Sequence, residues 1–182
     1  VPGRHNRNNA FLALQMALAL GCDEAKARAA LLSFRGVERR LQRIGERVYD
    51  DYAHNPEKLH AMWTTLAEAR PAGICGVGRP HGYAPLRKML DALVEMFSST
   101  IRAQDRLLVL PVYDAGGTAD RSINSDALVA RLGDKAVAVG DFDEAYAWCR
   151  ARHGDFAAFA VCGARDPGLA PFARRLAAAF AG

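Results

Sequence analysis

A short loop in the first third of the chain gathers side chains that could carry protons or bind a nucleotide. A strand-like stretch ends in Asp50 and Asp51, and His54 follows just before Pro56, a residue favoured at the first position of a helix. The Asp51 carboxylate could accept hydrogen bonds from ribose hydroxyls or hold a metal ion through water. The alternative is that the Asp and Asn side chains only cap the next helix and that His54 is solvated. The spacing of these residues leaves both interpretations open.

The beginning of the first helical stretch is rich in amide side chains. It carries His5, Asn6, Asn8 and Asn9 in close succession. One Asn is enough to cap a helix, at about 1 kcal/mol, so the others exceed what capping requires. An amide offers a donor and an acceptor side by side, which the edge of a purine requires of its partner. The segment is therefore a candidate for nucleotide binding, with simple capping as the alternative.

Two glycine-containing loops also follow strand-like stretches. The first, from Gly76 to Tyr83, falls short of the dinucleotide fingerprint GxGxxG because His81 stands where the third glycine belongs. The acidic residue that should follow about twenty positions later is also absent, so an oxidoreductase with a nicotinamide cofactor is weakly supported. The second loop, from Tyr113 to Gly117, is explained equally well by a flexible turn.

The composition is that of a soluble globular protein. Hydrophobic residues make up 51% of the 182 residues, and 24 Lys and Arg face 20 Asp and Glu, giving a net charge of +4. The basic residues are scattered, which argues against a nucleic-acid partner, and no apolar run is long enough to cross a membrane. The cysteines form no CxxC pair, and three lie in apolar runs, so we expect free, mostly buried thiols and a cytoplasmic protein. These cysteines are Cys22, Cys75, Cys149 and Cys162.

Helix-like and strand-like segments alternate along the chain. We expect helices at 6–20, 23–36, 56–69, 84–97, 124–132, 142–152 and 169–180. We expect strands at 41–51 (with a turn at 44–46), 73–78, 106–112, 136–139 and 157–161. Continuous apolar strands separated by helices predict an α/β fold with an open, mostly parallel, Rossmann-like sheet covered by helices on both faces. In the second helix, Ala27, Ala30, Leu31 and Phe34 should face inward.

The helical pair at the start differs in character from the alternating part. We expect a domain boundary that separates residues 1–45 from residues 46–182. In open parallel sheets, ligands bind outside the carboxyl ends of the strands. The functional residues should therefore lie in the loops 50–56, 78–85, 113–124, 140–141 and 162–168. The first residues do not form a signal peptide, and a start without Met is what an excised domain would show.

Taken together, these motifs resemble the Mur ligase family, and within it the type that includes UDP-N-acetylmuramate–L-alanine ligases and murein-peptide ligases. The resemblance covers nearly the whole chain. It rests on Pro2–Asn6 with Asn9-Ala10, Phe34–Arg40, Asp50–His54 with Pro56, Pro80-His81 with Tyr83, and Val112–Gly116.

The resemblance implies a cytoplasmic ligase of three domains. Most of this chain would be the carboxy-terminal domain, which closes over the cleft and brings the acceptor, and residues 1–45 would be the helical end of the central ATP-binding domain. ATP phosphorylates a substrate carboxylate, an amine attacks the acyl phosphate, and an amide, ADP and phosphate leave. The cofactors would be ATP and Mg²⁺, held mainly by the central domain. The partners would be a UDP-N-acetylmuramate-type substrate and an amino-acid or peptide acceptor, with no nucleic acid and no membrane.

The resemblance also implies roles for individual residues. Arg40 and His54 would be catalytic, with Arg40 facing the nucleotide phosphates. The nucleotide would be bound by His5, Asn6, Asn9, Arg40 and Asp51. The acceptor or acyl phosphate would be bound by His54, His81 and Arg79. No metal ligand is assigned to this chain. Replacing Asp51 or Arg40 by Ala in the intact enzyme should then abolish most turnover with little loss of thermal stability.

Two departures from the family pattern leave the acceptor open. The arginines that would hold the acceptor carboxylate after Pro80-His81 are replaced by Gly82, Pro85 and Leu86, so that Arg79 or Arg87 would have to substitute. The family subgroup also usually has two histidines where this chain has His54-Asn55. Because the sequence holds no GxxxxGK[ST] phosphate loop, we expect no ligase activity from this chain alone. A paralogue with another acceptor, or a stand-alone binding or regulatory module, remain the alternatives.

Overall fold

The computed structural model describes residues 3–181, apart from the side chains of Arg4 and His5. The chain divides into two compact units, Val1–Val37 and Glu38–Gly182. This boundary lies earlier than the expected one, so that residues 38–45 belong to the second unit. The reason is that the short strand β1 (Gln42–Arg43) pairs with β2 (Val48–Asp51) of the sheet.

The first unit is a pair of helices, α1 (Arg4–Ala19) and α2 (Glu24–Ser33). As expected, Asp23 begins α2, since its carboxylate accepts a hydrogen bond from the Lys26 N–H at 2.9 Å. The inward orientation expected in α2 is wrong: this helix has no buried residue, and Phe34 is 55% exposed. Two helices can cover only one side of each other, so the apolar side chains on the remaining sides stay exposed. The large ones are Phe11, Leu12, Met16, Leu20, Leu32, Phe34 and Val37.

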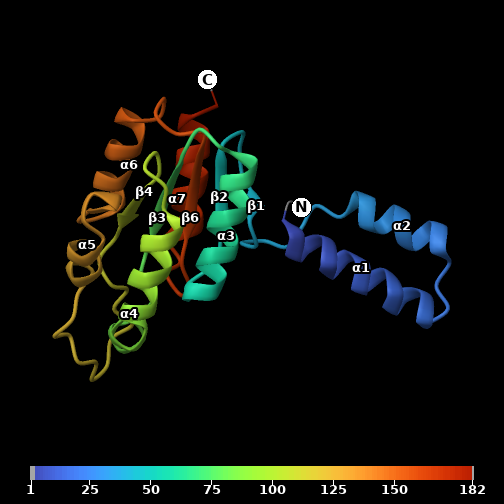
Figure 1. Cartoon of the computed structure of the whole chain (residues 1–182), viewed down its shortest axis with the longest axis horizontal. Helices are drawn as coiled ribbons and strands as arrows, with labels where there is room; N and C mark the ends of the chain where they lie inside the picture. Colours follow the sequence, from blue (N-terminus) through green and yellow to red (C-terminus); the bar gives the residue numbers. More distant parts are fainter. Residues whose placement is uncertain (1–2, 182) are drawn as a thin grey trace. The chain divides into compact units, whose positions relative to one another are not determined.

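The second unit is an open sheet whose strands run in the order β1-β2-β6-β3-β4-β5 (Figure 1). All neighbouring pairs are parallel except β1 with β2, which confirms the expected α/β architecture. The remaining strands are β3 (Ile74–Gly78), β4 (Arg106–Val109), β5 (Ala136–Ala138) and β6 (Ala158–Cys162). The helices are α3 (Pro56–Ala69), α4 (Tyr83–Thr100), α5 (Asp126–Leu132), the 3₁₀ helix η1 (Gly133–Lys135), α6 (Phe142–Ala151) and α7 (Leu169–Ala179). No helix among the described residues has both the length and the apolar character needed to span a membrane.

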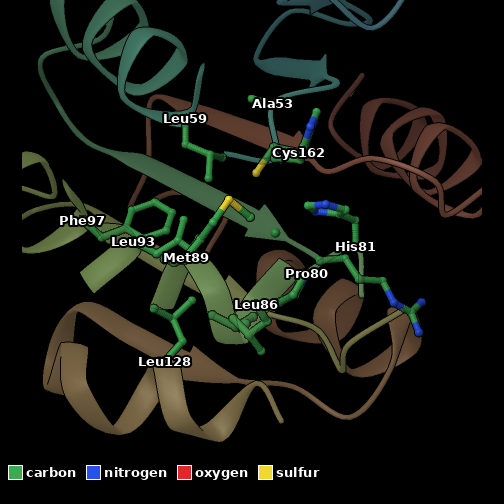
Figure 2. A pocket seen from close by; sticks show the side chains of 15 residues that line it. Ala53, Leu59, Pro80, His81, Leu86, Met89, Leu93, Phe97, Leu128 and Cys162 are labelled. Atoms are coloured by element: carbon green, nitrogen blue, oxygen red, sulfur yellow. The ribbon is translucent and has the colours of Figure 1, made fainter. Parts of the chain in front are cut away.

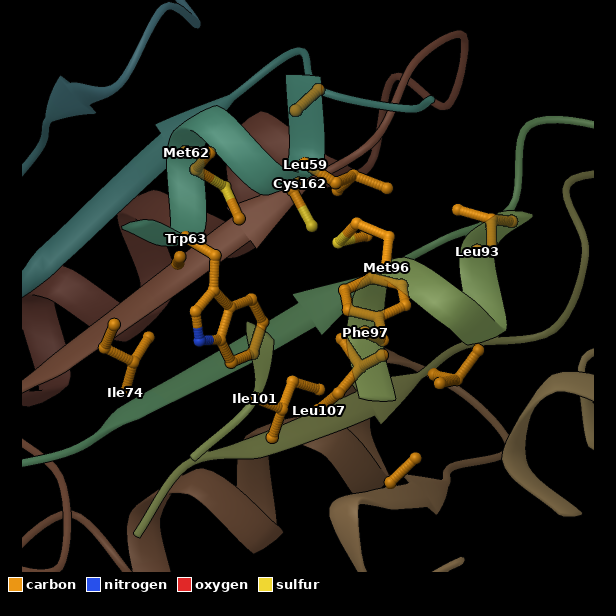
Figure 3. Close-up of a cluster of buried hydrophobic side chains, with 14 of the residues drawn as sticks. Leu59, Met62, Trp63, Ile74, Leu93, Met96, Phe97, Ile101, Leu107 and Cys162 are labelled. Atoms are coloured by element: carbon orange, nitrogen blue, oxygen red, sulfur yellow. The ribbon is translucent and has the colours of Figure 1, made fainter. Parts of the chain in front are cut away.

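Helices cover both faces of the sheet, and each face has its own apolar core. Alternate residues of a strand point to opposite faces, so Ile74 joins the cluster formed with α3 and α4, while Cys75 joins the cluster formed with α6 and α7. In the first cluster Trp63 packs edge-on against Phe97, with ring centroids 6.0 Å apart (Figure 3). Burial of each large side chain contributes about 1.5–3 kcal/mol, so these two clusters hold the sheet and its helices together.

The cysteines behave as expected from the sequence. All four are free, and Cys75, Cys149 and Cys162 are buried, whereas Cys22 is exposed. The three buried thiols act as small apolar side chains within the two cores.

At Gly76, in the middle of β3, the packing of neighbouring side chains leaves no room for a Cβ. A Cβ at this position would lie 2.5 Å from Cζ3 of Trp63, a side chain that is fully buried. The first glycine of the incomplete dinucleotide fingerprint therefore makes room for an indole ring on one face of the sheet. No approach of a phosphate is needed to explain it.

We predict that Gly76→Ala destabilises the chain by about 1–3 kcal/mol, because an extra methyl group would overpack the contact with Trp63. The matched control is Gly78→Ala, whose Cβ would meet Cys162 Sγ at 3.5 Å, an ordinary contact distance. Urea denaturation of both variants measures the difference. Equal losses of unfolding free energy in the two variants would contradict this account of Gly76.

Candidate functional site

The carboxyl ends of three adjacent strands bring the candidate loops together. Cys162 at the end of β6 lies level with both Asp51 of β2 and Gly78 of β3. Beyond these positions the Arg79 N–H donates to the Cys162 carbonyl at 3.2 Å, and the Gly163 N–H donates to the Asp51 carbonyl at 3.2 Å. The loops that follow β2, β3 and β6 therefore share one edge of the sheet.

His54 and His81 meet at this edge, and both line a small pocket between the sheet, α3 and α4. Figure 2 shows His81 beside Pro80 at this pocket. The ring centroids of the two histidines are 4.8 Å apart and their planes are inclined by 76°. The cavity has a volume of about 40 Å³, room for roughly three water molecules and not for a nucleotide. Its wall is mostly apolar and includes Leu59, Leu86, Met89, Leu93, Phe97, Leu107, Val109, Leu128 and Cys162.

The tautomer of His54 is fixed by the backbone. Its Nδ1 lies 2.8 Å from the carbonyl oxygen of Tyr52. Because a carbonyl can only accept a hydrogen bond, Nδ1 carries the proton and donates it, and Nε2 of the neutral ring is left as an acceptor.

His81 is held in its neutral form. Its pKa is lowered from the ordinary value, first by partial burial and then by the nearby charges of His54 and Arg165. An imidazole with a lowered pKa is largely unprotonated at neutral pH. The largely uncharged ring of His81 therefore lies against the ring of His54 beside the pocket.

Asp51 anchors the turn that carries Arg40. One carboxylate oxygen accepts the Leu41 N–H at 2.7 Å and the other accepts the Ala53 N–H at 2.7 Å. Burial raises the pKa of Asp51, against the opposing effect of these bonds and of the Arg40 charge. The structure thus brings Asp51 and the exposed Arg40 together, but it also gives Asp51 a structural role that the sequence analysis did not foresee.

A second carboxylate beside it, Asp50, forms an ion pair that the sequence analysis missed. Asp50 is 1% exposed and receives the Arg39 Nε at 3.2 Å, while Arg39 Nη2 donates to the Gly163 carbonyl at 2.8 Å. Burial raises the pKa of Asp50, and the Arg39 guanidinium opposes this effect without cancelling it. The alternation of side chains along a strand was the sequence feature that could have revealed this pair. It requires Asp50 and Asp51 to point to opposite faces of the sheet.

The two arginines considered as anchors for the acceptor are both engaged elsewhere. Arg79 pairs with the buried Asp166 at 2.6 Å and donates to the Pro111 carbonyl at 3.0 Å. Arg87 pairs with Asp120 at 2.6 Å. Arg79 lines the pocket, but these contacts give its guanidinium a structural role in joining three loops.

The remaining candidates lie in the first unit. Asn6 and Asn9 belong to α1, as does the backbone of His5, whose side chain is outside the described residues. Their assignment to a nucleotide stays a prediction. Within the described part of the chain, no cluster of His, Cys, Asp and Glu has the make-up of a metal site.

Comparison with known proteins identifies the family. The sequence model described as "Mur ligase, glutamate ligase domain" matches residues 39–165. The chain belongs to the Mur ligase family. The UDP-N-acetylmuramate–L-alanine ligases of Chelativorans sp. (strain BNC1) and Sinorhizobium medicae (strain WSM419) are each 38% identical over 136 residues, which is 72% of this chain and 28% of the relative. The chain therefore spans less than a third of the length of these relatives.

Solved structures of other proteins have the same fold. The UDP-N-acetylmuramate-alanine ligase of Thermotoga maritima superposes on 97% of this chain and 37% of its own with a TM-score of 0.71 and 26% identity. The folylpolyglutamate synthase of Mycobacterium tuberculosis covers 97% of this chain with 40% of its own at a TM-score of 0.65, and its 22% identity supports the shared fold alone. The expected resemblance is confirmed.

We predict that Asp51→Ala lowers the free energy of unfolding by about 1–3 kcal/mol, because two backbone N–H groups lose their acceptor. This revises the expectation of little stability loss. Arg40→Ala is the control and should change stability by less than about 0.5 kcal/mol, since its side chain is exposed. Urea denaturation at neutral pH checks both, and an unaffected Asp51→Ala variant would show that the anchored turn is dispensable.

We predict that His81 titrates below about 6.5, the ordinary value, in an NMR titration of its imidazole signals. The His54→Gln variant should raise the pKa of His81, because one of the causes of its depression is removed. Since the folded pKa lies below the unfolded one, the unfolded state binds more protons, and stability falls as pH drops from about 6.5 through the folded pKa. An His81 that titrates at or above its ordinary value would contradict the arrangement at the pocket mouth.

Proposed function

We propose that this chain is the carboxy-terminal part of an ATP-dependent, ADP-forming ligase of peptidoglycan precursor synthesis, a cytoplasmic enzyme. The full-length enzyme would join an amino acid or peptide to the carboxylate of a UDP-N-acetylmuramate-type substrate. The names of the relatives and the family match support this proposal. The first unit would be the end of the ATP-binding domain, and ATP with Mg²⁺ would be held mainly outside this chain. ATP supplies the phosphoryl group that activates the substrate carboxylate.

The observation that carries the proposal is the pair of imidazole rings, His54 and His81, that lie together against a small apolar pocket. An amine attacks only after it has lost a proton, and an unprotonated imidazole nitrogen within reach can accept that proton. Nε2 of His54 is such an acceptor, because Nδ1 is engaged by the Tyr52 carbonyl. The pocket is too small for a nucleotide and suits one end of an amine acceptor. His54 and His81 would therefore face the acceptor.

Arg40 would serve the phosphate side of the reaction. Its guanidinium is exposed, and the neighbouring backbone is fixed by the bond from Leu41 N–H to Asp51. A cation held in place before the reaction stabilises the charge that develops on a transferred phosphoryl group. Asp51 would then act mainly by positioning this turn.

The acceptor need not be that of the matched relatives. Gly82, Pro85 and Leu86 carry no guanidinium, and both Arg79 and Arg87 are engaged by carboxylates. A ligase of the same reaction type with a different acceptor is therefore the second candidate, and a comparison of acceptors distinguishes the two.

We predict that the full-length ligase carrying this domain releases phosphate only when ATP, a UDP-N-acetylmuramate-type substrate and an amine acceptor are all present. His54→Gln should lower kcat about 100-fold or more, because the proton acceptor is lost. His60→Gln is the matched control, since this histidine is exposed and its ring hydrogen-bonds to Thr100 on α4. Phosphate release with a panel of amino acids and peptides identifies the acceptor.

Two results would count against the proposal. No phosphate release from the wild-type enzyme with any UDP-sugar substrate would remove the ligase assignment. Full activity of His54→Gln would show that this histidine is not the proton acceptor, and it would leave the ligase assignment unaffected. The 182-residue chain by itself should show no turnover of ATP.

A further inference from the structure

An anion bound at the mouth of the pocket would need a counterion from this chain. The wall below His54 and His81 is apolar, and an unpaired carboxylate placed against such a surface loses hydration without compensation. The pKa of His81 is lowered, so this ring is largely uncharged at neutral pH. A permanent positive charge at the pocket would have to come from a guanidinium or ammonium group on a neighbouring loop.

Two of the arginines near this edge are already paired. Arg79 is held by Asp166 at 2.6 Å, and Arg87 is held by Asp120 at 2.6 Å and by the Ser122 hydroxyl at 2.7 Å. A carboxylate that binds a guanidinium occupies the donors that a ligand would need. Neither arginine is free to act as the counterion without breaking a contact that joins two loops.

Arg165 lies on the loop that runs beside the His81 loop. Two residues earlier, the Cβ position of Gly163 is only 3.0 Å from the Arg79 carbonyl oxygen, and one residue later Asp166 pairs with Arg79. The segment 163–166 is thus fixed against the segment that leads to His81. The positive charge of Arg165 reaches His81, since it is one of the groups that depress the pKa of that histidine.

The guanidinium of Arg165 is available to a ligand. The side chain is exposed, and it makes no hydrogen bond or ion pair to any other residue that the structure describes. This sets it apart from Arg39 and Arg79 on the same edge, which are both tied to buried carboxylates.

The backbone at Arg165 is strained. Its φ of +66° lies in the left-handed region, where glycine is at ease and a long side chain is uncommon. Such a conformation costs free energy that the surrounding structure must supply, and residues of this kind cluster at binding and active sites. A glycine at this position would adopt the same backbone conformation without this strain.

We propose that Arg165 is the anion-binding residue of the acceptor site: its guanidinium binds the free carboxylate of the amine acceptor while His54 and His81 face the amine. The inference rests on the proposed ligase function. It makes Arg165 a specificity-determining residue that selects acceptors with a carboxylate near the amine. The guanidinium, on the loop after β6, replaces the charge that is missing after Pro80-His81.

The test is Arg165→Gly in the full-length ligase, a change that removes the guanidinium and relieves the strained backbone. The melting temperature should stay the same or rise. KM for the acceptor should increase about tenfold or more, while KM for ATP and for the UDP-sugar substrate stay unchanged. The wild type should prefer the acceptor over its carboxamide analogue, and the variant should lose that preference. Lys88→Gln, which removes one exposed positive charge on α4, is the control and should behave as wild type.

Several outcomes would overturn the inference. An increase in KM for ATP alone would mean that Arg165 binds a phosphoryl group, and unchanged kinetics would mean that it binds neither ligand. If the wild type releases no phosphate with any acceptor, the ligase proposal fails first. Arg165 is then judged on the 182-residue chain by NMR titration with free amino acids, in the millimolar range of weak binding. A shift of the His81 signals that disappears in Arg165→Gly and with amino-acid amides supports anion binding, and the absence of any shift refutes it.

Discussion

The site depends on one constraint, the parallel pairing of β6 between β2 and β3. This pairing sets Asp51, Cys162 and Gly78 level with one another at the carboxyl edge of the sheet. Residues from three distant parts of the sequence consequently leave the sheet at the same place. A shift of β6 by one residue would turn its side chains to the opposite faces and separate the loops. The two apolar cores, one on each face, exclude that shift.

The charged residues at this edge fall into two groups, those in largely buried ion pairs and those exposed to solvent. Asp50 with Arg39, and Asp166 with Arg79, are largely buried pairs that join neighbouring loops. Buried pairs add little net stability compared with apolar packing, but loss of one partner is costly, so they fix which arrangement is adopted. With two guanidinium groups used in this way, Arg40 and Arg165 remain exposed at the same rim. We regard this division as the physical basis for the separate phosphate and acceptor sides proposed for the domain.

Sequence reasoning predicted the architecture well because hydrophobic periodicity depends on local geometry. The alternation of strands and helices in the second unit, the start of α2 near Asp23 and the position of His54 and His81 at the sheet edge all followed from pattern. Contacts between residues far apart in sequence could not be predicted. Periodicity does not reveal that Gly76 accommodates Trp63, or that Asp51 binds the backbone of Leu41. The prediction of an inward face for α2 was wrong, because an amphipathic pattern does not show which surface, if any, covers the helix.

Cys162 gives the pocket an unreactive wall. Burial, with the negative charges of Asp51 and Asp50, raises the pKa of this thiol to about 12. The thiolate is the form that reacts with electrophiles and peroxides, and only about one thiol in 10⁵ would be ionised at neutral pH. Cys162 should therefore stay a reduced, apolar side chain under oxidising conditions. For the same reason, inhibitors designed to alkylate this cysteine would find a poor nucleophile, and reversible ligands that use the apolar wall are the better chemical starting point.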